Sequence, residues 1–104
     1  MDEYIIVTTL CNDEEIAKQI TLSLLENKLV AGSQVSKVKS IYWWKNKLEE
    51  SEEYHLEFRT KKHLFDEVKA EIKKIHDYEV AEISAVKIEN ANPEFLKWID
   101  ENVK

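Results

Sequence analysis

The sequence has 104 residues, of which 43% are hydrophobic and 35% are charged, and its formal net charge is −6. This length predicts a single domain over residues 1–104 with one hydrophobic core. The acidic balance argues against nucleic-acid and anionic-membrane partners, because both are bound mainly through Lys and Arg. The single cysteine excludes an internal disulfide. The acidic start Met1-Asp2-Glu3 lacks the basic region of a signal peptide, and no apolar run is long enough to span a bilayer, so we expect a cytoplasmic protein.

The first two expected elements are a strand and a helix. Residues 4–10 form an apolar, β-branched run with apolar side chains at both parities, which predicts a central strand buried on both faces. Asn12 and Glu15 have the spacing of a capping box, so we expect Asn12 to cap a helix that ends near residues 27–28. The apolar stripe of this helix comprises Ile16, Ile20 and Leu24.

A long β-hairpin is expected next. Residues 29–44 are extended, and the irregular spacing of their apolar side chains indicates a bulge or a bend. Residues 45–47 form the turn, and residues 54–61 alternate between apolar and polar side chains as a half-buried strand does. At about 3.3 Å per residue, arms of about 14 residues reach roughly 45 Å, which is more than the helices can cover.

The outer end of this hairpin carries Ile41-Tyr42-Trp43-Trp44. An uncovered apolar strand end is an aggregation hazard. We therefore expect a symmetric oligomer whose subunits cover each other's hairpins.

The remaining segments complete the order. A second helical stripe runs over residues 64–75, residues 80–89 predict a fourth strand, and Asn92-Pro93 is typical of a helix start with proline at the first helical position. The order βαββαβ with a C-terminal helix predicts an α+β, ferredoxin-like fold with an extended middle hairpin.

Three blocks of the sequence resemble the divalent-cation-tolerance (CutA) family. They are Ile41-Tyr42-Trp43-Trp44 followed by Lys47 and Glu49-Glu50, the segment His76-Asp77-Tyr78-Glu79-Val80-Ala81-Glu82-Ile83, and the closing segment Asn92-Pro93-Glu94-Phe95-Leu96-Lys97-Trp98-Ile99. The resemblance implies a homotrimer in which the long hairpins pair across subunits, and a role in tolerance to divalent metals, notably copper. Asp77 and Ala81 stand where the family motif has prolines, and Gly32 stands where the family commonly has Cys.

His76, Glu79 and Glu82 are the best candidate metal ligands, because one imidazole and two carboxylates can hold zinc or copper(II). The alternative is a structural histidine near a helix end, where its charge is favourable. The only cofactor that these residues suggest is a divalent metal ion, copper or zinc.

The resemblance also implies a ligand pocket between subunits. Its expected residues, converging from neighbouring chains, are Tyr42, Trp44, Lys47, Lys61, His76 and Tyr78. The two lysines would then bind a small anion such as a carboxylate. The alternative is that the tryptophans only pack in a subunit interface, where Trp is enriched.

The function expected from these features is a trimeric, non-catalytic protein of metal homeostasis. The alternative is a module that binds a small anion or a partner protein in the intersubunit pocket. An acylphosphatase-like enzyme needs a cradle of backbone N–H groups, usually rich in glycine, together with an arginine. Gly32 and Arg59 are the only glycine and arginine of the sequence, so no enzyme is expected.

Overall fold

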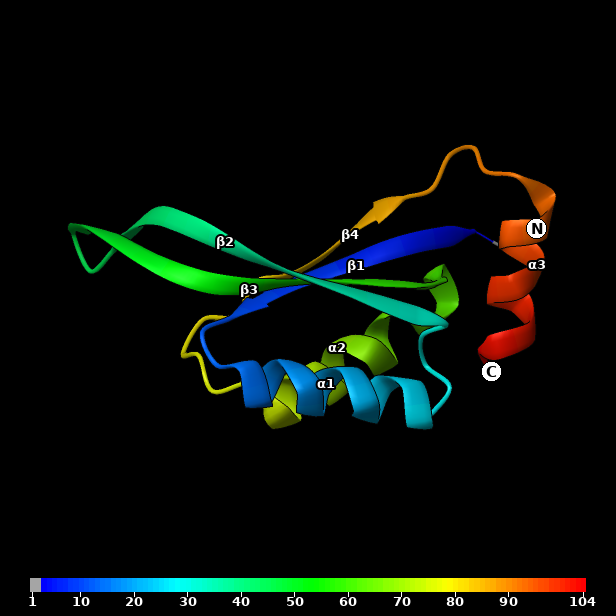
Figure 1. The fold of residues 1–104 in the computed structure, drawn as a ribbon, viewed down its shortest axis with the longest axis horizontal. Coiled ribbons are helices and arrows are strands. Elements are labelled where there is room, and N and C mark those ends of the chain that lie inside the picture. Colours follow the sequence, from blue (N-terminus) through cyan, green and yellow to red (C-terminus); the bar gives the residue numbers. More distant parts are fainter. Residues whose placement is uncertain (1–2) are drawn as a thin grey trace.

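The computed structural model describes residues 3–104, so the acidic start at Met1-Asp2 lies outside the described residues. The chain forms a four-stranded antiparallel sheet in the order β2-β3-β1-β4. Two helices, α1 and α2, lie side by side under one face of it (Figure 1). The elements are β1 (Tyr4–Cys11), α1 (Glu14–Glu26), β2 (Gly32–Trp44), β3 (Lys47–Lys61), a 3-10 turn (Lys62–Leu64), α2 (Phe65–Ile75), β4 (Ile83–Lys87) and α3 (Pro93–Asn102). This arrangement confirms the predicted fold class.

β1 occupies the predicted central position, between β3 and β4. Its side chains alternate between fully buried and half-buried, because successive strand residues point to opposite faces. The buried set belongs to one core cluster with side chains of α1 and α2, whereas α3 lies only near one end of the sheet (Figure 1). Burial on both faces, as the sequence predicts, is therefore not reached within one chain. The largest fully buried core side chains include Val7, Ile20, Leu24, Leu56, Phe58, Leu64, Val68 and Ile72.

The start of α1 differs from the prediction by one residue. Asp13, not Asn12, is the N-cap, and its carboxylate accepts the backbone N–H groups of Glu15 at 2.8 Å and of Ile16 at 3.3 Å. A carboxylate at this position satisfies unpaired helix donors and faces the positive end of the helix dipole. Asp13 therefore supplies the cap that the sequence pattern assigned to its neighbour.

α1 ends where the sequence predicts, at Glu26, with Asn27 as its C-cap. The next residue, Lys28, takes a left-handed conformation with φ of 57°. The Lys28 N–H donates to Leu25 O, and the Leu29 N–H donates to Leu24 O. This pair of bonds is a Schellman motif, which turns the chain from the helix back toward the sheet.

The β2–β3 hairpin is a continuous ladder from Gly32 opposite Arg59 to Trp44 opposite Lys47. The predicted bulge is wrong. Neither face of β2 is buried along its length. The spacing of its apolar residues is therefore irregular, because no single face of the strand packs against the core. The turn consists of Lys45 and Asn46, with φ of 49° and 66°. Two left-handed residues are typical of a type I′ turn, which matches the twist of paired strands.

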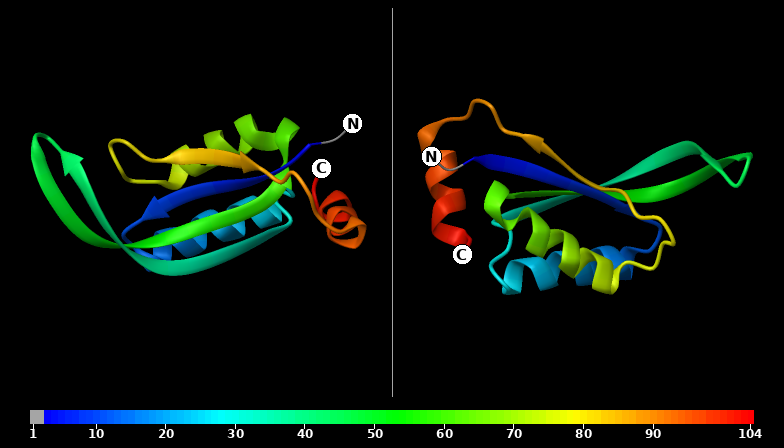
Figure 2. Two further views of the ribbon diagram at one scale, coloured as in Figure 1. Left: turned by 90° about the horizontal axis from the view of Figure 1, so that it is seen from above. Right: turned by 180° about the vertical axis from the view of Figure 1, so that it is seen from behind.

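Only part of the hairpin belongs to the four-stranded sheet. β1 pairs with residues 54–61 of β3, and the outer half of the hairpin continues as two strands alone (Figure 2). The long axis of the molecule measures 44 Å. We call residues 32–37 and 54–61 the hairpin root, and residues 40–51 the hairpin tip.

The last strand is shorter than predicted. β4 covers Ile83–Lys87 rather than residues 80–89, because it pairs with β1 only from Ile5 opposite Lys87 to Thr9 opposite Ile83. Residues 76–82 form a loop instead. Among residues 3–104, no helix combines the length and the apolar character that crossing a membrane requires.

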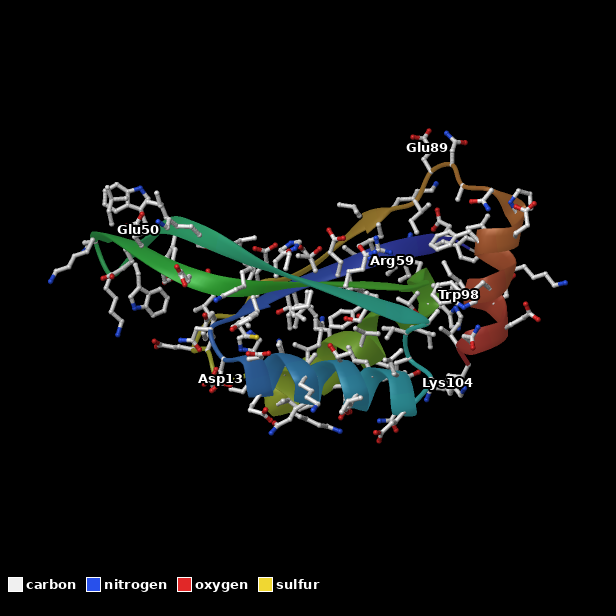
Figure 3. All side chains as sticks on the ribbon, in the orientation of Figure 1. Asp13, Glu50, Arg59, Glu89, Trp98 and Lys104 are labelled. Carbon is white, nitrogen blue, oxygen red and sulfur yellow. The ribbon has the colours of Figure 1, made fainter. Side chains whose placement is uncertain are left out.

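α3 begins as predicted, with Asn92 as N-cap and proline in its first turn. The helix packs against the end of the sheet at the hairpin root, with Trp98 pointing toward the strands (Figure 3). A methyl group on Gly32 would come within 2.8 Å of the Trp98 ring. The Asp100 carboxylate lies 2.7 Å from the Lys61 amine and accepts a hydrogen bond from the Tyr4 hydroxyl at 2.8 Å. Gly32 thus stands where only the smallest residue lets α3 approach.

Candidate functional site

A hollow of about 650 Å³ lies between the hairpin and the loop of residues 76–82. Ser40, Tyr42 and Trp44 line it from β2, where their spacing of two residues directs all three to one side of the strand. The full lining comprises Leu10, Ser40, Tyr42, Trp43, Trp44, Glu53, Asp77, Tyr78, Glu79, Val80, Ala81 and Glu82.

His76 holds the start of the loop against the sheet. Its side chain is 1% exposed, and Nε2 is hydrogen bonded to Leu10 O. Nδ1 accepts the backbone N–H of Tyr78 at 3.2 Å. An acceptor at Nδ1 assigns the proton to Nε2, so this geometry corresponds to the neutral imidazole.

Tyr78 connects the loop to the hairpin. Its hydroxyl donates to Glu53 Oε2 at 2.7 Å, and its ring lies 4.6 Å from that of His76, measured between centroids. Burial, together with the hydrogen bond to Glu53 and the charge of that carboxylate, raises the pKa of Tyr78 well above its usual range. The hydroxyl therefore stays protonated and acts as the donor, while Glu53 supplies the negative charge.

The three predicted metal ligands do not meet within one chain. Both ring nitrogens of His76 are engaged by the backbone, Glu79 pairs with Lys45 at 3.9 Å, and Glu82 accepts a hydrogen bond from Ser84 at 3.0 Å. In the described part of the chain, no group of three or more His, Cys, Asp or Glu side chains is arranged to hold a metal ion. A metal centre built from more than one copy stays a prediction.

Only some of the six predicted pocket residues lie at the hollow. Tyr42, Trp44 and Tyr78 line the hollow, and His76 supports its wall. Lys47 is the partner of Trp44 in the ladder but is not part of the lining. Lys61 lies at the other end of β3, roughly 45 Å along the strand, and pairs with Asp100. The two lysines can therefore join one site only if neighbouring subunits bring them together, which stays a prediction.

Sequence reasoning missed Glu53 as part of the site. The acidic run at residues 49–53 reads as a solvated, edge-protecting face, yet Glu53 is only 6% exposed. The signal that distinguishes it is its register, because Glu53 is the first residue of the run beyond the β1 pairing and lies opposite Val38. Only the loop that folds over this position explains its burial.

Cys11 lies at the end of β1, close to this site. Its side chain is buried, and its thiol donates to Asp13 O at 3.6 Å. Burial, the largest cause, raises the pKa of the Cys11 thiol above its usual value. A protonated, buried thiol is a weak nucleophile and a poor metal ligand.

Comparisons with known proteins agree with this architecture. The family described as "CutA1 divalent ion tolerance protein" matches residues 5–102. A divalent-cation tolerance protein CutA from Archaeoglobus fulgidus is 40% identical over 101 residues, covering 97% of this chain and 95% of that protein. One from Pyrococcus horikoshii is 34% identical over 100 residues, covering 96% and 98%.

Solved structures support the same conclusion. The crystal structure of CutA1 from Oryza sativa has a TM-score of 0.94 at 27% identity, covering 98% of this chain and 94% of that one. CutA1 from Pyrococcus horikoshii gives 0.91 at 33% identity, covering 96% and 98%. A matching structure from Archaeoglobus fulgidus is described as a periplasmic divalent cation tolerance protein, with a TM-score of 0.90 and 38% identity over the full length of both chains. The chain therefore belongs to the CutA1 divalent ion tolerance protein family.

Proposed function

We propose that this chain acts in the cytoplasm as a homotrimeric, non-catalytic protein of divalent-cation tolerance. Family membership supports the role in cation tolerance. The observation that supports assembly is the bare hairpin tip, where Ile41, Trp43 and Leu48 are 67%, 71% and 63% exposed. An isolated two-stranded ribbon is marginal in water, so this segment gains most from a neighbouring subunit.

The sheet offers a second surface for assembly. Its face opposite α1 and α2 carries the half-buried residues of β1 and the apolar Val86 of β4, which is 62% exposed. This face is continuous with the hairpin, so one neighbouring subunit can cover both. A closed ring of three copies removes the exposed apolar area from water without leaving an open end.

The proposed ions are copper(II) and zinc, which imidazole and carboxylate ligands accept. Because the ring nitrogens of His76 are engaged within the chain, the ion would be held between copies, by carboxylates of the 76–82 loop together with a side chain of a neighbouring subunit. His76 would then orient the loop that carries Glu79 and Glu82.

Native mass spectrometry with and without copper, zinc and cadmium tests both parts of this proposal. We expect a trimer that takes up copper or zinc, and weaker uptake in His76→Ala. His63→Ala is the matched control, because His63 is an exposed histidine in the 3-10 turn. A monomer at micromolar concentration would refute the assembly, and an unchanged mass with every ion would refute the metal part.

A second candidate function is favoured by the hollow itself. Its volume lies in the range of ligand pockets, and four aromatic residues line it. We propose as this alternative that the chain is a binding module for a small molecule or a partner protein. Trp44→Ala should then abolish ligand binding. Lys47→Ala changes a residue outside the lining and should leave the trimer intact. Loss of the trimer in both variants would instead assign these residues to structure.

A further inference from the structure

The lining of the hollow has a consistent chemistry. Four of its residues are aromatic and four are acidic, and none of the lining residues within the described chain is Lys, Arg or His. The aromatic residues are Tyr42, Trp43, Trp44 and Tyr78, and the acidic residues are Glu53, Asp77, Glu79 and Glu82. Ring faces are electron-rich and attract cations, as do carboxylates. The lining that one chain supplies therefore favours a cation over a small anion.

Glu53 shows the same preference most directly. Its side chain is almost fully buried, and the hydrogen bond recorded for it comes from the neutral hydroxyl of Tyr78. Within residues 3–104, no Lys, Arg or His side chain forms an ion pair with it. A buried carboxylate without a counter-ion is costly, so a cation entering the hollow recovers a large part of that cost.

The protein's own amine illustrates how such a cation is held. The Lys45 ammonium lies 5.6 Å from the centroid of the Trp44 ring and 3.9 Å from a carboxylate oxygen of Glu79. Both of its partners also line the hollow. Two residues of the lining, Trp44 and Glu79, thus already hold an alkylammonium group between an indole ring and a carboxylate.

We propose that the hollow binds an organic ammonium ion, with Trp44 and Tyr42 contacting its alkyl groups and Glu53 neutralising its charge. A bare metal ion fits less well, because it needs several donor atoms at about 2 Å, and the described residues offer no such cluster. This inference rests on the second candidate function, and it replaces an anionic ligand by a cationic one.

Calorimetric titration with tetramethylammonium chloride tests the proposal, with sodium chloride at equal ionic strength and uncharged tert-butanol as reference solutes. We expect saturable binding of tetramethylammonium and none of tert-butanol. Glu53→Gln removes the charge while its amide oxygen can still accept the Tyr78 hydroxyl, so we expect binding at least about tenfold weaker, because one close charge pair is lost.

Glu50→Gln is the matched control, because Glu50 is an exposed glutamate of the hairpin tip outside the lining (Figure 3). It should bind tetramethylammonium as the unsubstituted chain does. Equal weakening in both variants would overturn the proposal, since it would show only diffuse attraction to an acidic protein. Saturable binding of phosphate with none of tetramethylammonium would overturn the cationic ligand but keep the binding module. Absence of binding by every probe would overturn both. Native mass spectrometry on the same samples measures the oligomeric state independently of ligand binding.

Discussion

The root and the tip of the β2–β3 hairpin share one ladder of backbone pairing but lie in opposite environments. In the root, Leu56 and Phe58 are fully buried between the sheet and the helices. In the tip, Trp43 and Leu48 sit opposite each other in the ladder and are 71% and 63% exposed. The difference arises because the root has β1 as a third strand and helices beneath it, whereas the tip has only its own two strands within the described chain.

This contrast shows that strand pairing alone does not define a folded core. Both halves satisfy their backbone groups on one side equally well, yet only the root buries apolar area within the chain. The stability of the root should therefore be intrinsic, and that of the tip should depend on what covers it.

The largest effect should come from Phe58→Ala. Removing this ring leaves a cavity in the core and should lower the free energy of unfolding by about 3–5 kcal/mol. Trp43→Ala in the tip should change the stability of the dilute chain by no more than about 0.5 kcal/mol and should weaken assembly instead. Urea unfolding followed at several protein concentrations, together with gel filtration, separates the two effects. Comparable losses for both variants in the dilute chain would show that the tip belongs to the intrinsic core.

The next largest effect concerns Gly32, where the root meets α3. Gly32→Ala places a methyl group 2.8 Å from a ring carbon of Trp98 and should cost about 1–3 kcal/mol, because the ring or the helix must move. Thermal unfolding measures the loss. The double variant Gly32→Ala with Trp98→Leu should recover part of it, and a loss that is unchanged in the double variant would argue against this contact as its cause.

A smaller effect is expected at the two lysines that hold a positive φ, one below the root and one in the tip. Lys28→Gly relieves a left-handed lysine in the Schellman motif and should raise the global free energy of unfolding by about 0.5–1 kcal/mol. Lys45→Asn at the turn should give a similar gain that appears only in local opening of the tip. Hydrogen exchange distinguishes them, because slower exchange should spread over the core amides in the first variant and stay near the turn in the second. Uniform slowing by Lys45→Asn would contradict the independence of the tip.

The smallest effect should be pH-dependent and concerns Asp100 on α3. The hydrogen bond from Lys61, followed by that from Tyr4, holds the pKa of Asp100 below its ordinary value of 3.8. A carboxyl group with a lowered folded-state pKa contributes stability above its unfolded-state pKa, and this contribution is lost as the pH falls through the folded-state value. Asp100→Asn should therefore reduce stability at pH 7 and flatten its decline below about pH 4. Glu101→Gln, an exposed change on the same helix, should leave that decline in place. An unaltered decline in Asp100→Asn would assign acid sensitivity to other carboxylates.

Much of the fold was predictable from local patterns. The alternation of residues 54–61 and the two helical stripes each reflect the periodicity that one buried face imposes, and Asn92-Pro93 marks a helix start. These signals are local, and they gave the element order. The errors occurred where burial did not drive the pattern, as in β2, or where neighbouring residues compete for one role, as Asn12 and Asp13 do at the helix start.

The candidate site was predictable only in part. Tyr42, Trp44 and Tyr78 were named from their sequence blocks and do meet at the hollow, and His76 supports its wall. Glu53 stands in an acidic run that is typical of a solvated face, and only its register beside the end of the β1 pairing distinguishes it from the other glutamates. The anionic site expected from Lys47 and Lys61 needs neighbouring chains to bring the two lysines together, because β3 separates them in one chain, and it stays a prediction.

The sequence by itself determined the type and order of the elements, the overlong hairpin and the acidic character of the surface, because all of these follow from composition and local periodicity. Only the tertiary structure decided that β3 lies between β1 and β2, that Gly32 faces Trp98, and that a loop buries Glu53 beside aromatic rings. These contacts join residues far apart in the chain, and they depend on register and loop geometry. A local pattern records that a residue is buried, but not which residue covers it.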